Sequence, residues 1–109
     1  MKAFEVWWAS LPEPVGRRPV LLLTRSAAYR YLDWVLVAEI TSTVRGIPQE
    51  IALGRAEGLS RASVANFDNV HRIRREWLDR RAGALAPGRH AEVKRALGFA
   101  LDWLELKRL

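Results

Sequence analysis

The sequence predicts a mainly β fold of the α+β type, a small barrel-like sheet of short strands followed by one C-terminal helix. Short apolar runs of strand length recur between turns that contain glycine or proline, from about residue 4 to residue 85. The only long stretch with helical spacing follows Pro87. Because 109 residues suit one domain with one modest core, we expect residues 1–109 to form a single domain.

The first half of the chain supplies three predicted strands. Residues 4–9 fit a half-buried strand, and the loop 10–16, with two prolines and a glycine, ends it. An apolar run over 19–24 begins with a proline, which suits a first strand position because proline has no N–H for the ladder. After a short helical turn over 27–31, the almost entirely apolar run 34–41 is typical of a central strand.

Two neighbouring tryptophans occur in the first predicted strand. Trp7 and Trp8 lie on opposite faces of any strand, so we expect one of them in the core. The other has two open roles, stacking on a nucleic-acid base or supporting a subunit contact.

The second half supplies shorter strands and the helix. We expect strands over 49–53, 62–68, 70–74 and 80–85, separated by polar turns. The helix carries an apolar stripe at helical spacing, made of Val93, Leu97, Ala100 and Leu104. A second apolar row widens this stripe beyond one contact surface and indicates a partner, either a second subunit or a bound peptide: Ala96, Phe99, Trp103 and Leu106.

Composition narrows the classes of function. The chain has 18 Lys plus Arg against 12 Asp plus Glu, a formal net charge of +6, and arginine supplies almost all of the cations. Guanidinium groups bind phosphate in a bidentate way, so this bias favours a nucleic-acid partner, with an arginine-rich solvated surface as the alternative. The absence of cysteine excludes disulfides and thiol chemistry. With only His71 and His90 and no spaced ligand cluster, we expect neither a metal nor a cofactor.

The sequence also carries no sign of a membrane protein. No apolar run reaches the roughly 18 residues needed to span a bilayer. The N-terminal residues lack the apolar core of a signal peptide. We therefore expect a cytoplasmic protein without a membrane partner.

The remaining chemistry is metal-free phosphate chemistry at the rim of the sheet. The second predicted strand opens with Arg17 and Arg18, and the third ends in the hydroxyl residues Thr41, Ser42 and Thr43. RNA supplies its own nucleophile, the 2′-hydroxyl, so a protein can cleave it by holding the phosphate in line and stabilising the charge that develops on its oxygens. Proton transfer is open at this point, with Asp68 or Glu39 as the base.

Four ordered segments resemble one family, the MazF/PemK toxins of bacterial toxin–antitoxin pairs. The first is Glu-Val-Trp-Trp at residues 5–8, and the second is Arg-Pro-Val-Leu-Leu-Leu at 18–23. The third is Ile-Thr-Ser-Thr-Val-Arg-Gly-Ile-Pro-Gln-Glu-Ile at 40–51, and the fourth is Ser-Val-Ala-Asn-Phe-Asp-Asn at 63–69. Together these segments cover most of the chain.

The resemblance implies an SH3-like small barrel, a homodimer and a metal-independent endoribonuclease that cleaves single-stranded RNA selectively. The products would be a 2′,3′-cyclic phosphate and a 5′-hydroxyl, and the partner would be a cognate, acidic antitoxin. The catalytic arginine of the family maps to Arg18 and its threonine to Thr41. We expect neighbouring residues to bind the RNA: Arg17, Ser42, Thr43, Arg45, Asn66 and Asp68.

The chain departs from the family pattern at two positions. Some members carry Arg-x-Asp where this chain has Asn66-Phe67-Asp68, which favours the version of the mechanism that uses Arg18 and Thr41. Many members have proline where this chain has Glu39. Two alternatives remain, a non-enzymatic gyrase poison like the CcdB proteins, acting through the segment around Trp103, and an inactive binding module of the same fold.

Overall fold

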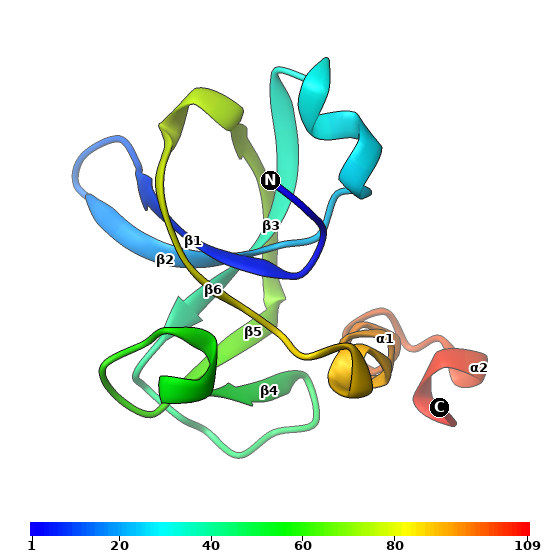
Figure 1. Ribbon diagram of the computed structural model, residues 1–109. Helices are drawn as coiled ribbons and strands as arrows, with labels where there is room; N and C mark the ends of the chain where they lie inside the picture. The colour runs from blue at the N-terminus through cyan, green and yellow to red at the C-terminus, as the bar shows by residue number, and fades with distance from the viewer.

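The computed structural model describes residues 1–109 and consists of one strongly curled, antiparallel six-stranded sheet with a helix against one end (Figure 1). The strand order in the sheet is β4-β5-β3-β2-β1-β6. The strands are β1 Glu5–Ser10, β2 Arg17–Leu22, β3 Trp34–Thr41, β4 Glu50–Leu53, β5 Ser63–Arg74 and β6 Leu78–Ala84. The helices are α1 His90–Leu101 and α2 Leu104–Lys107, with short 3₁₀ turns η1 Ser26–Arg30, η2 Arg55–Glu57, η3 Arg75–Trp77 and η4 Pro87–Arg89. The predicted mainly β fold with a C-terminal helix is confirmed.

The central strand β3 passes from one hydrophobic cluster to another. Val35 and Val37 lie in a small cluster of nine buried residues. Ala38 and Ile40, on the opposite face of the same strand, lie in a large cluster of twelve, which includes residues of α1. Beyond the small cluster, Glu39 and Thr41 continue the face of Val37 but are only partly buried. The strand therefore presents two polar side chains beside its buried half.

The long strand β5 differs from the expectation of two strands over 62–68 and 70–74. It runs unbroken from residue 63 to residue 74, and its pairing with β3 shifts between Ala38↔Val70 and Glu39↔Asn66. Residues 67–69 therefore have no partner on β3, and the strand absorbs them as an enlarged bulge that bends it rather than ending it. The expected last strand also begins earlier, at Leu78.

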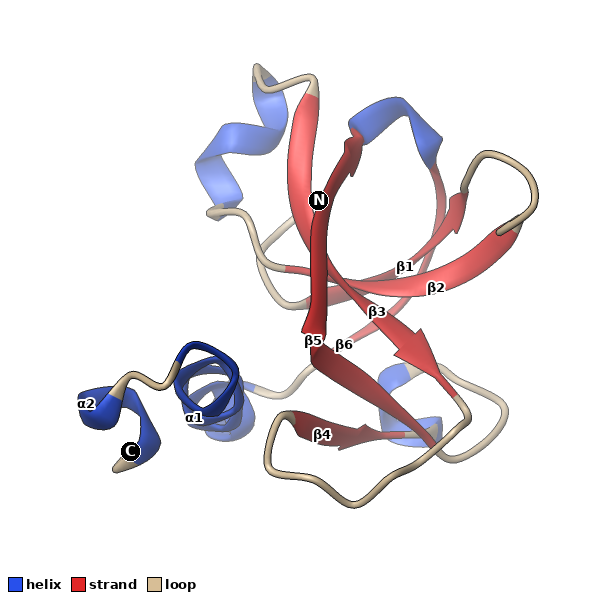
Figure 2. Ribbon diagram, turned by 180° about the vertical axis from the view of Figure 1, so that it is seen from behind, coloured by secondary structure: helices blue, strands red, loops and turns tan.

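The C-terminal helix is shorter than its apolar spacing predicts. The helix α1 ends at Leu101, where Asp102 takes a left-handed conformation with φ of 53° and the chain turns back into α2 (Figure 2). Gly98 permits the close return, because a Cβ at that position would lie 2.6 Å from Cβ of Leu106. The prediction that one helical stripe extends to Leu104 is wrong.

Both predicted apolar rows of the helix are buried at their N-terminal ends and exposed toward the C-terminus. Val93 and Ala96 are buried in the large cluster, and Leu97 and Ala100 pack against it. Five large apolar residues of the C-terminal part are exposed: Phe99, Leu101, Trp103, Leu104 and Leu109. None of the helices has the length and apolar character needed to cross a membrane.

Candidate functional site

The structure brings Arg18 and Thr41 to the same face of the sheet. In the pairing of β2 with β3, Val20 lies opposite Glu39. Arg18 precedes Val20 by two residues and Thr41 follows Glu39 by two, so both share the face of that pair. Both side chains line each of two cavities, of about 280 and 350 Å³. The guanidinium and the hydroxyl thus stand between two adjoining hollows in the surface.

The first cavity combines cations, hydroxyls and an aromatic wall. Its guanidinium groups come from Arg17, Arg18 and Arg61, and Trp8 supplies the aromatic ring. Its hydroxyl groups come from Thr41, Ser42, Ser60 and Ser63. No carboxylate lines it. Such a lining suits an anion, because donors surround the cavity and no negative charge opposes the ligand.

The second cavity lies on the other side of Arg18 and Thr41. Thr43, Arg45, Asn66 and Asn69 line it together with Glu39. Glu39 is the only carboxylate in either cavity. Its Oε2 accepts a hydrogen bond from Nδ2 of Asn69 at 2.8 Å and lies 3.0 Å from Nε2 of His71. The face of β3 is therefore open at this end, and the carboxylate also has an imidazole partner.

The neighbouring arginines Arg17 and Arg18 have opposite surroundings. Arg17 donates from Nη2 to Oδ1 of Asp79 at 2.8 Å and from Nε to Oδ2 at 3.3 Å, and its guanidinium lies 4.7 Å from the ring centre of Trp8. The hydrogen bond with Asp79 raises the pKa of Arg17, and the bond from Arg17 lowers the pKa of Asp79. Arg18 contacts no carboxylate and donates only to the carbonyl oxygen of Val15, at 3.4 Å. The charge of Arg18 is therefore free for a ligand.

The loop after β3 is held in shape by Thr41 and Glu50. Oγ1 of Thr41 accepts the backbone N–H of Thr43 at 3.1 Å, which leaves the hydroxyl proton of Thr41 for another acceptor. Glu50 accepts the backbone N–H groups of Arg45 and Gly46 at 3.1 and 2.9 Å. These bonds place Thr43 and Arg45 at the second cavity without using the guanidinium of Arg45.

The loop that carries Ser60 and Arg61 is fixed by a close backbone contact. Gly58 has φ of 88°, and a Cβ there would lie 2.0 Å from the carbonyl oxygen of Ala82. A Cβ at Gly83 would in turn lie 2.4 Å from the carbonyl oxygen of Glu57. The two glycines let η2 and β6 touch, which sets the position of the loop. Ser60 and Arg61 were not predicted from the sequence, and this pair of glycines was the only local signal.

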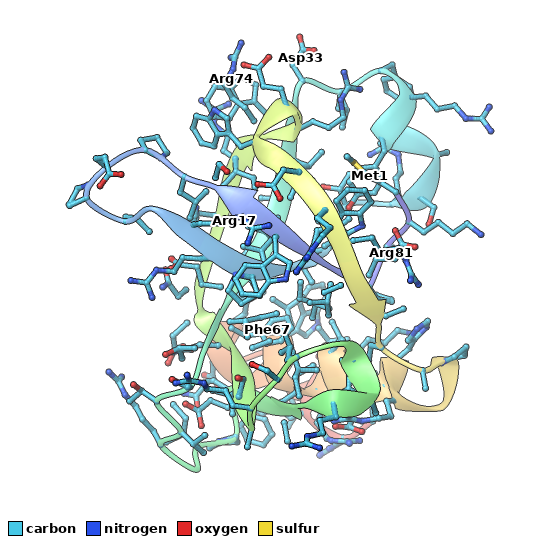
Figure 3. All side chains as sticks on the ribbon, turned by 60° about the vertical axis from the view of Figure 1, so that its left-hand side comes forward. Met1, Arg17, Asp33, Phe67, Arg74 and Arg81 are labelled. Carbon is cyan, nitrogen blue, oxygen red and sulfur yellow. The ribbon has the colours of Figure 1, made fainter.

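Five of the six predicted RNA-binding residues line a cavity. Arg17 and Ser42 lie at the first cavity, and Thr43, Arg45 and Asn66 at the second. Asp68 lies outside both, because it falls in the exposed bulge of β5, where its backbone N–H bonds Oδ1 of Asn66 at 2.9 Å. Figure 3 shows Asp33 and Arg74 at one end of the molecule and Arg17 nearer its middle.

The histidines do not form a pair. His71 contacts Glu39, whereas the ring of His90 packs edge-on against Phe4 with ring centres 4.5 Å apart. No group of three or more His, Cys, Asp and Glu side chains is arranged to hold a metal ion.

Comparison with known proteins identifies the family. Residues 2–101 match the model of the family described as PemK-like, MazF-like toxin of type II toxin-antitoxin system. The "Probable endoribonuclease MazF5" of Mycobacterium tuberculosis is 39% identical over 99 residues, which are 90% of this chain and 90% of that protein.

Solved structures agree with this match. The structure titled "Mycobacterium tuberculosis toxin MazF-mt6" is 36% identical with a TM-score of 0.84, covering 90% of this chain and 96% of the other. An endoribonuclease from a mycobacterial species, solved in complex with its cognate antitoxin, has the same fold with a TM-score of 0.79 at 24% identity, covering 94% and 96% of the two chains. The chain belongs to the PemK-like, MazF-like toxins of type II toxin–antitoxin systems.

Proposed function

We propose that this protein is the toxin of a toxin–antitoxin pair and acts in the cytoplasm as an endoribonuclease that cleaves single-stranded RNA selectively and without a metal. One observation carries the proposal: Arg18 and Thr41, from two different strands, both line each of the two adjoining cavities. A single phosphodiester placed between the cavities would meet a free guanidinium and a free hydroxyl proton at once.

The proposed reaction uses the nucleophile that RNA carries. The 2′-oxygen attacks the adjacent phosphorus, the bond to the 5′-oxygen breaks, and the products are a 2′,3′-cyclic phosphate and a 5′-hydroxyl. Arg18 binds the non-bridging oxygens, on which negative charge develops, and Thr41 donates its hydroxyl proton in a hydrogen bond to the same phosphate. Removing one such donor typically lowers kcat by about 10²–10³-fold.

The two cavities give the RNA a path on both sides of that phosphate. The first cavity offers the ring of Trp8, with the guanidinium of Arg17 over it, for base stacking, and the hydroxyl of Ser42 beside it. On the other side, Thr43, Arg45 and Asn66 supply donors and acceptors at the second cavity. Stacking on Trp8 needs an unpaired base, which favours single-stranded RNA. The polar groups of the second cavity are our candidates for sequence selection.

Two protein partners complete the proposal. The related endoribonuclease solved with its cognate antitoxin supports an antitoxin partner for this chain. An acidic segment is the matching ligand, because Arg18, Arg45 and Arg61 have no carboxylate partner within the chain. A second copy of the chain would cover exposed apolar residues of the C-terminal part, among them Leu101 and Trp103.

The proposal is tested by cleavage of a short single-stranded RNA in the presence of a chelator. We expect wild-type protein to cleave and to leave 2′,3′-cyclic phosphate ends, identified by product mass. We expect Arg18→Ala and Thr41→Val to lose most of this activity while keeping the wild-type melting temperature. Wild-type rates in both variants would remove the site assignment, and loss of cleavage on chelation would remove the metal-free mechanism.

A second function is favoured by the exposed C-terminal segment. Trp103 and Leu104 are 51% and 53% exposed, as a docking segment of a CcdB-like gyrase poison would be. A chain truncated after Leu101 separates the two functions. On our proposal the truncated chain still cleaves RNA, whereas a gyrase poison acting through Trp103 would lose its toxicity.

A further inference from the structure

The two cavities contain one carboxylate, that of Glu39, and a carboxylate is a proton acceptor. The other acidic side chains near the site are occupied or lie outside it. Asp79 binds Arg17, and Glu50 binds two backbone N–H groups of the loop. Glu57 is buried and accepts the backbone N–H of Gly54 at 2.7 Å.

The hydrogen bonds of Glu39 leave one of its oxygens free. Both partners, Asn69 and His71, bind Oε2, and no hydrogen bond involves Oε1. The side chain of Glu39 is 23% exposed and that of His71 is 38% exposed. The carboxylate is thus held in one orientation by two donors from β5, while its second oxygen is available at a cavity that solvent reaches.

The position of Glu39 relative to Arg18 and Thr41 fits the geometry of the proposed reaction. Glu39 and Thr41 are two residues apart on one face of β3, a separation of roughly 7 Å along the strand. Arg18 projects from the neighbouring strand, and cross-strand neighbours on one face stand about 5 Å apart. A phosphate bound by Arg18 and Thr41 therefore places its flanking ribose within reach of the Glu39 carboxylate.

We propose that Glu39 is the catalytic base of the RNA cleavage and that His71 and Asn69 are positioning residues that hold its carboxylate. This inference rests on the proposed endoribonuclease function. A carboxylate opposes the binding of a phosphate anion, so its presence among the cavity arginines is unfavourable for binding alone. A role as proton acceptor in the reaction explains why a carboxylate lies at this position.

The step balances without a further reactant except water. Oε1 of Glu39 takes the proton of the 2′-hydroxyl as the bond between the 2′-oxygen and phosphorus forms. The bond from phosphorus to the 5′-oxygen breaks, and that oxygen takes a proton from a water molecule in the open cavity. Glu39 then releases its proton to solvent, and the hydrogen bond from Nε2 of His71 stabilises the carboxylate that returns.

The experiment measures the single-turnover cleavage rate on one short RNA against pH, over the whole range in which the protein stays folded. We expect Glu39→Gln to lower the cleavage rate about 10²–10⁴-fold. We also expect it to abolish the acidic limb of the profile, which is the increase of the cleavage rate as the pH rises from acidic values. A Gln side chain still accepts hydrogen bonds from Asn69 and His71, so the fold should hold. Glu39→Asp keeps a carboxylate, so a reduced rate that still rises with pH is expected.

Positioning by His71 predicts a different pattern. We expect His71→Gln to shift the midpoint of the acidic limb and to lower the rate less than Glu39→Gln, with an unchanged melting temperature. The charged and titratable groups facing Glu39 are His71 from β5, Arg18 from β2 and Arg45 from the loop. A purely structural His71 would change the melting temperature and leave the pH profile in place.

Binding and control measurements test the role of Glu39 separately from the proposed endoribonuclease function. RNA with a 2′-O-methyl group at the cleaved position should bind Glu39→Gln at least as tightly as wild type, because one negative charge is gone. Glu76→Gln, which removes an exposed carboxylate paired with Arg74, should cleave at the wild-type rate. Failure of wild-type protein to cleave RNA overturns the proposed function together with this inference. If wild-type protein cleaves RNA and Glu39→Gln cleaves at the same rate with the same rise of rate with pH, only the role of Glu39 is overturned. If Asp68→Asn loses that rise of rate with pH, the catalytic base is Asp68 instead.

Discussion

Arginine serves two regions of this molecule in contrasting ways. Where α1 begins, Arg89 is saturated: it donates to both carboxylate oxygens of Glu92 at 2.8 Å, to the carbonyl oxygen of Ala52 at 2.7 Å and to the buried Glu57 at 3.4 Å. We call this region the helix anchor. At the cavities, Arg18, Arg45 and Arg61 have no carboxylate partner. Neighbouring carboxylates therefore distinguish an arginine that stabilises the fold from an arginine whose charge is available to a ligand.

The largest expected effect is on stability, at the helix anchor. Arg89→Met would leave the buried Glu57 without its cation and the carbonyl of Ala52 without its donor. We expect a loss of about 3 kcal/mol in the free energy of unfolding. For a domain of this size, that loss lowers Tm by roughly 12–20 °C. Urea and thermal unfolding measure it, and a variant as stable as wild type would show that this arginine is as dispensable to the fold as those of the cavities.

The same region should make stability depend on acid. Hydrogen bonding from Arg89 lowers the pKa of Glu92 below its ordinary value of 4.5. A carboxyl with a lowered folded-state pKa adds stability at pH values above its unfolded pKa and loses it as pH falls through the folded value. We therefore expect wild type to lose stability between about pH 5 and pH 3. Arg89→Met should lose less over that interval in urea unfolding at the two pH values, and an equal loss in both proteins would contradict the assignment.

The next largest expected effect is at the cavities, where a substitution should change activity and leave stability unchanged. Arg18→Lys keeps the positive charge but removes the two-pronged donor, so we expect cleavage to fall roughly 10–100-fold without a change in Tm. Arg89→Lys is the matched control, with reduced Tm and, below its melting temperature, wild-type cleavage. Full activity in the Arg18→Lys variant would mean that charge, rather than the geometry of the fork, is what the phosphate requires.

Arg17 lines a cavity but is also paired with a carboxylate, so it has features of both groups of arginines, and a smaller effect is expected there. Asp79→Asn removes the carboxylate that neutralises Arg17. We expect RNA to bind this variant a few-fold more tightly at low salt, with a steeper dependence of affinity on salt concentration. Fluorescence anisotropy over a salt series measures both quantities. Unchanged affinity would place Arg17 with the structural arginines.

The smallest effect concerns the outer cations of the cavities. Arg61→Ala removes one unpaired guanidinium, so the slope of log affinity against log salt should fall by somewhat less than one unit, about 0.7 for a single strand. Arg74→Ala removes an arginine paired with Glu76 at the other end of the molecule and should leave the slope unchanged. Equal slopes in all three proteins would remove Arg61 from the path of the RNA.

Local sequence signals predicted most of the fold and part of the site. Apolar runs of strand length located β1, β2 and β3, and prolines and a glycine marked the loop between the first two, because strand propensity and turn chemistry are properties of neighbouring residues. The single long β5 and the break at Asp102 were not predicted. The first depends on a bulge set by pairing with β3, and the second depends on the contact between Gly98 and Leu106. Both depend on contacts in the folded chain, which the spacing of apolar residues along one segment does not show.

The residues of the site also differ in whether the sequence alone indicated them. Arg18 and Thr41 were proposed because they flank two predicted strands and because the catalytic arginine and threonine of the resembled family map to them. Arg61 was missed, because its position follows from the backbone contact between Gly58 and β6. The partners of Glu39 lie 30 and 32 residues away from it, so the sequence left its role open.

The passage of β3 between two clusters has a consequence for where the strand tolerates substitution. Residues 35 and 37 are fully enclosed, whereas 39 and 41 on the same side are not, so a single strand is divided into a half that tolerates only apolar side chains and a half that tolerates variety. A substitution at 39 or 41 is therefore expected to cost the fold less stability than one at 35 or 37.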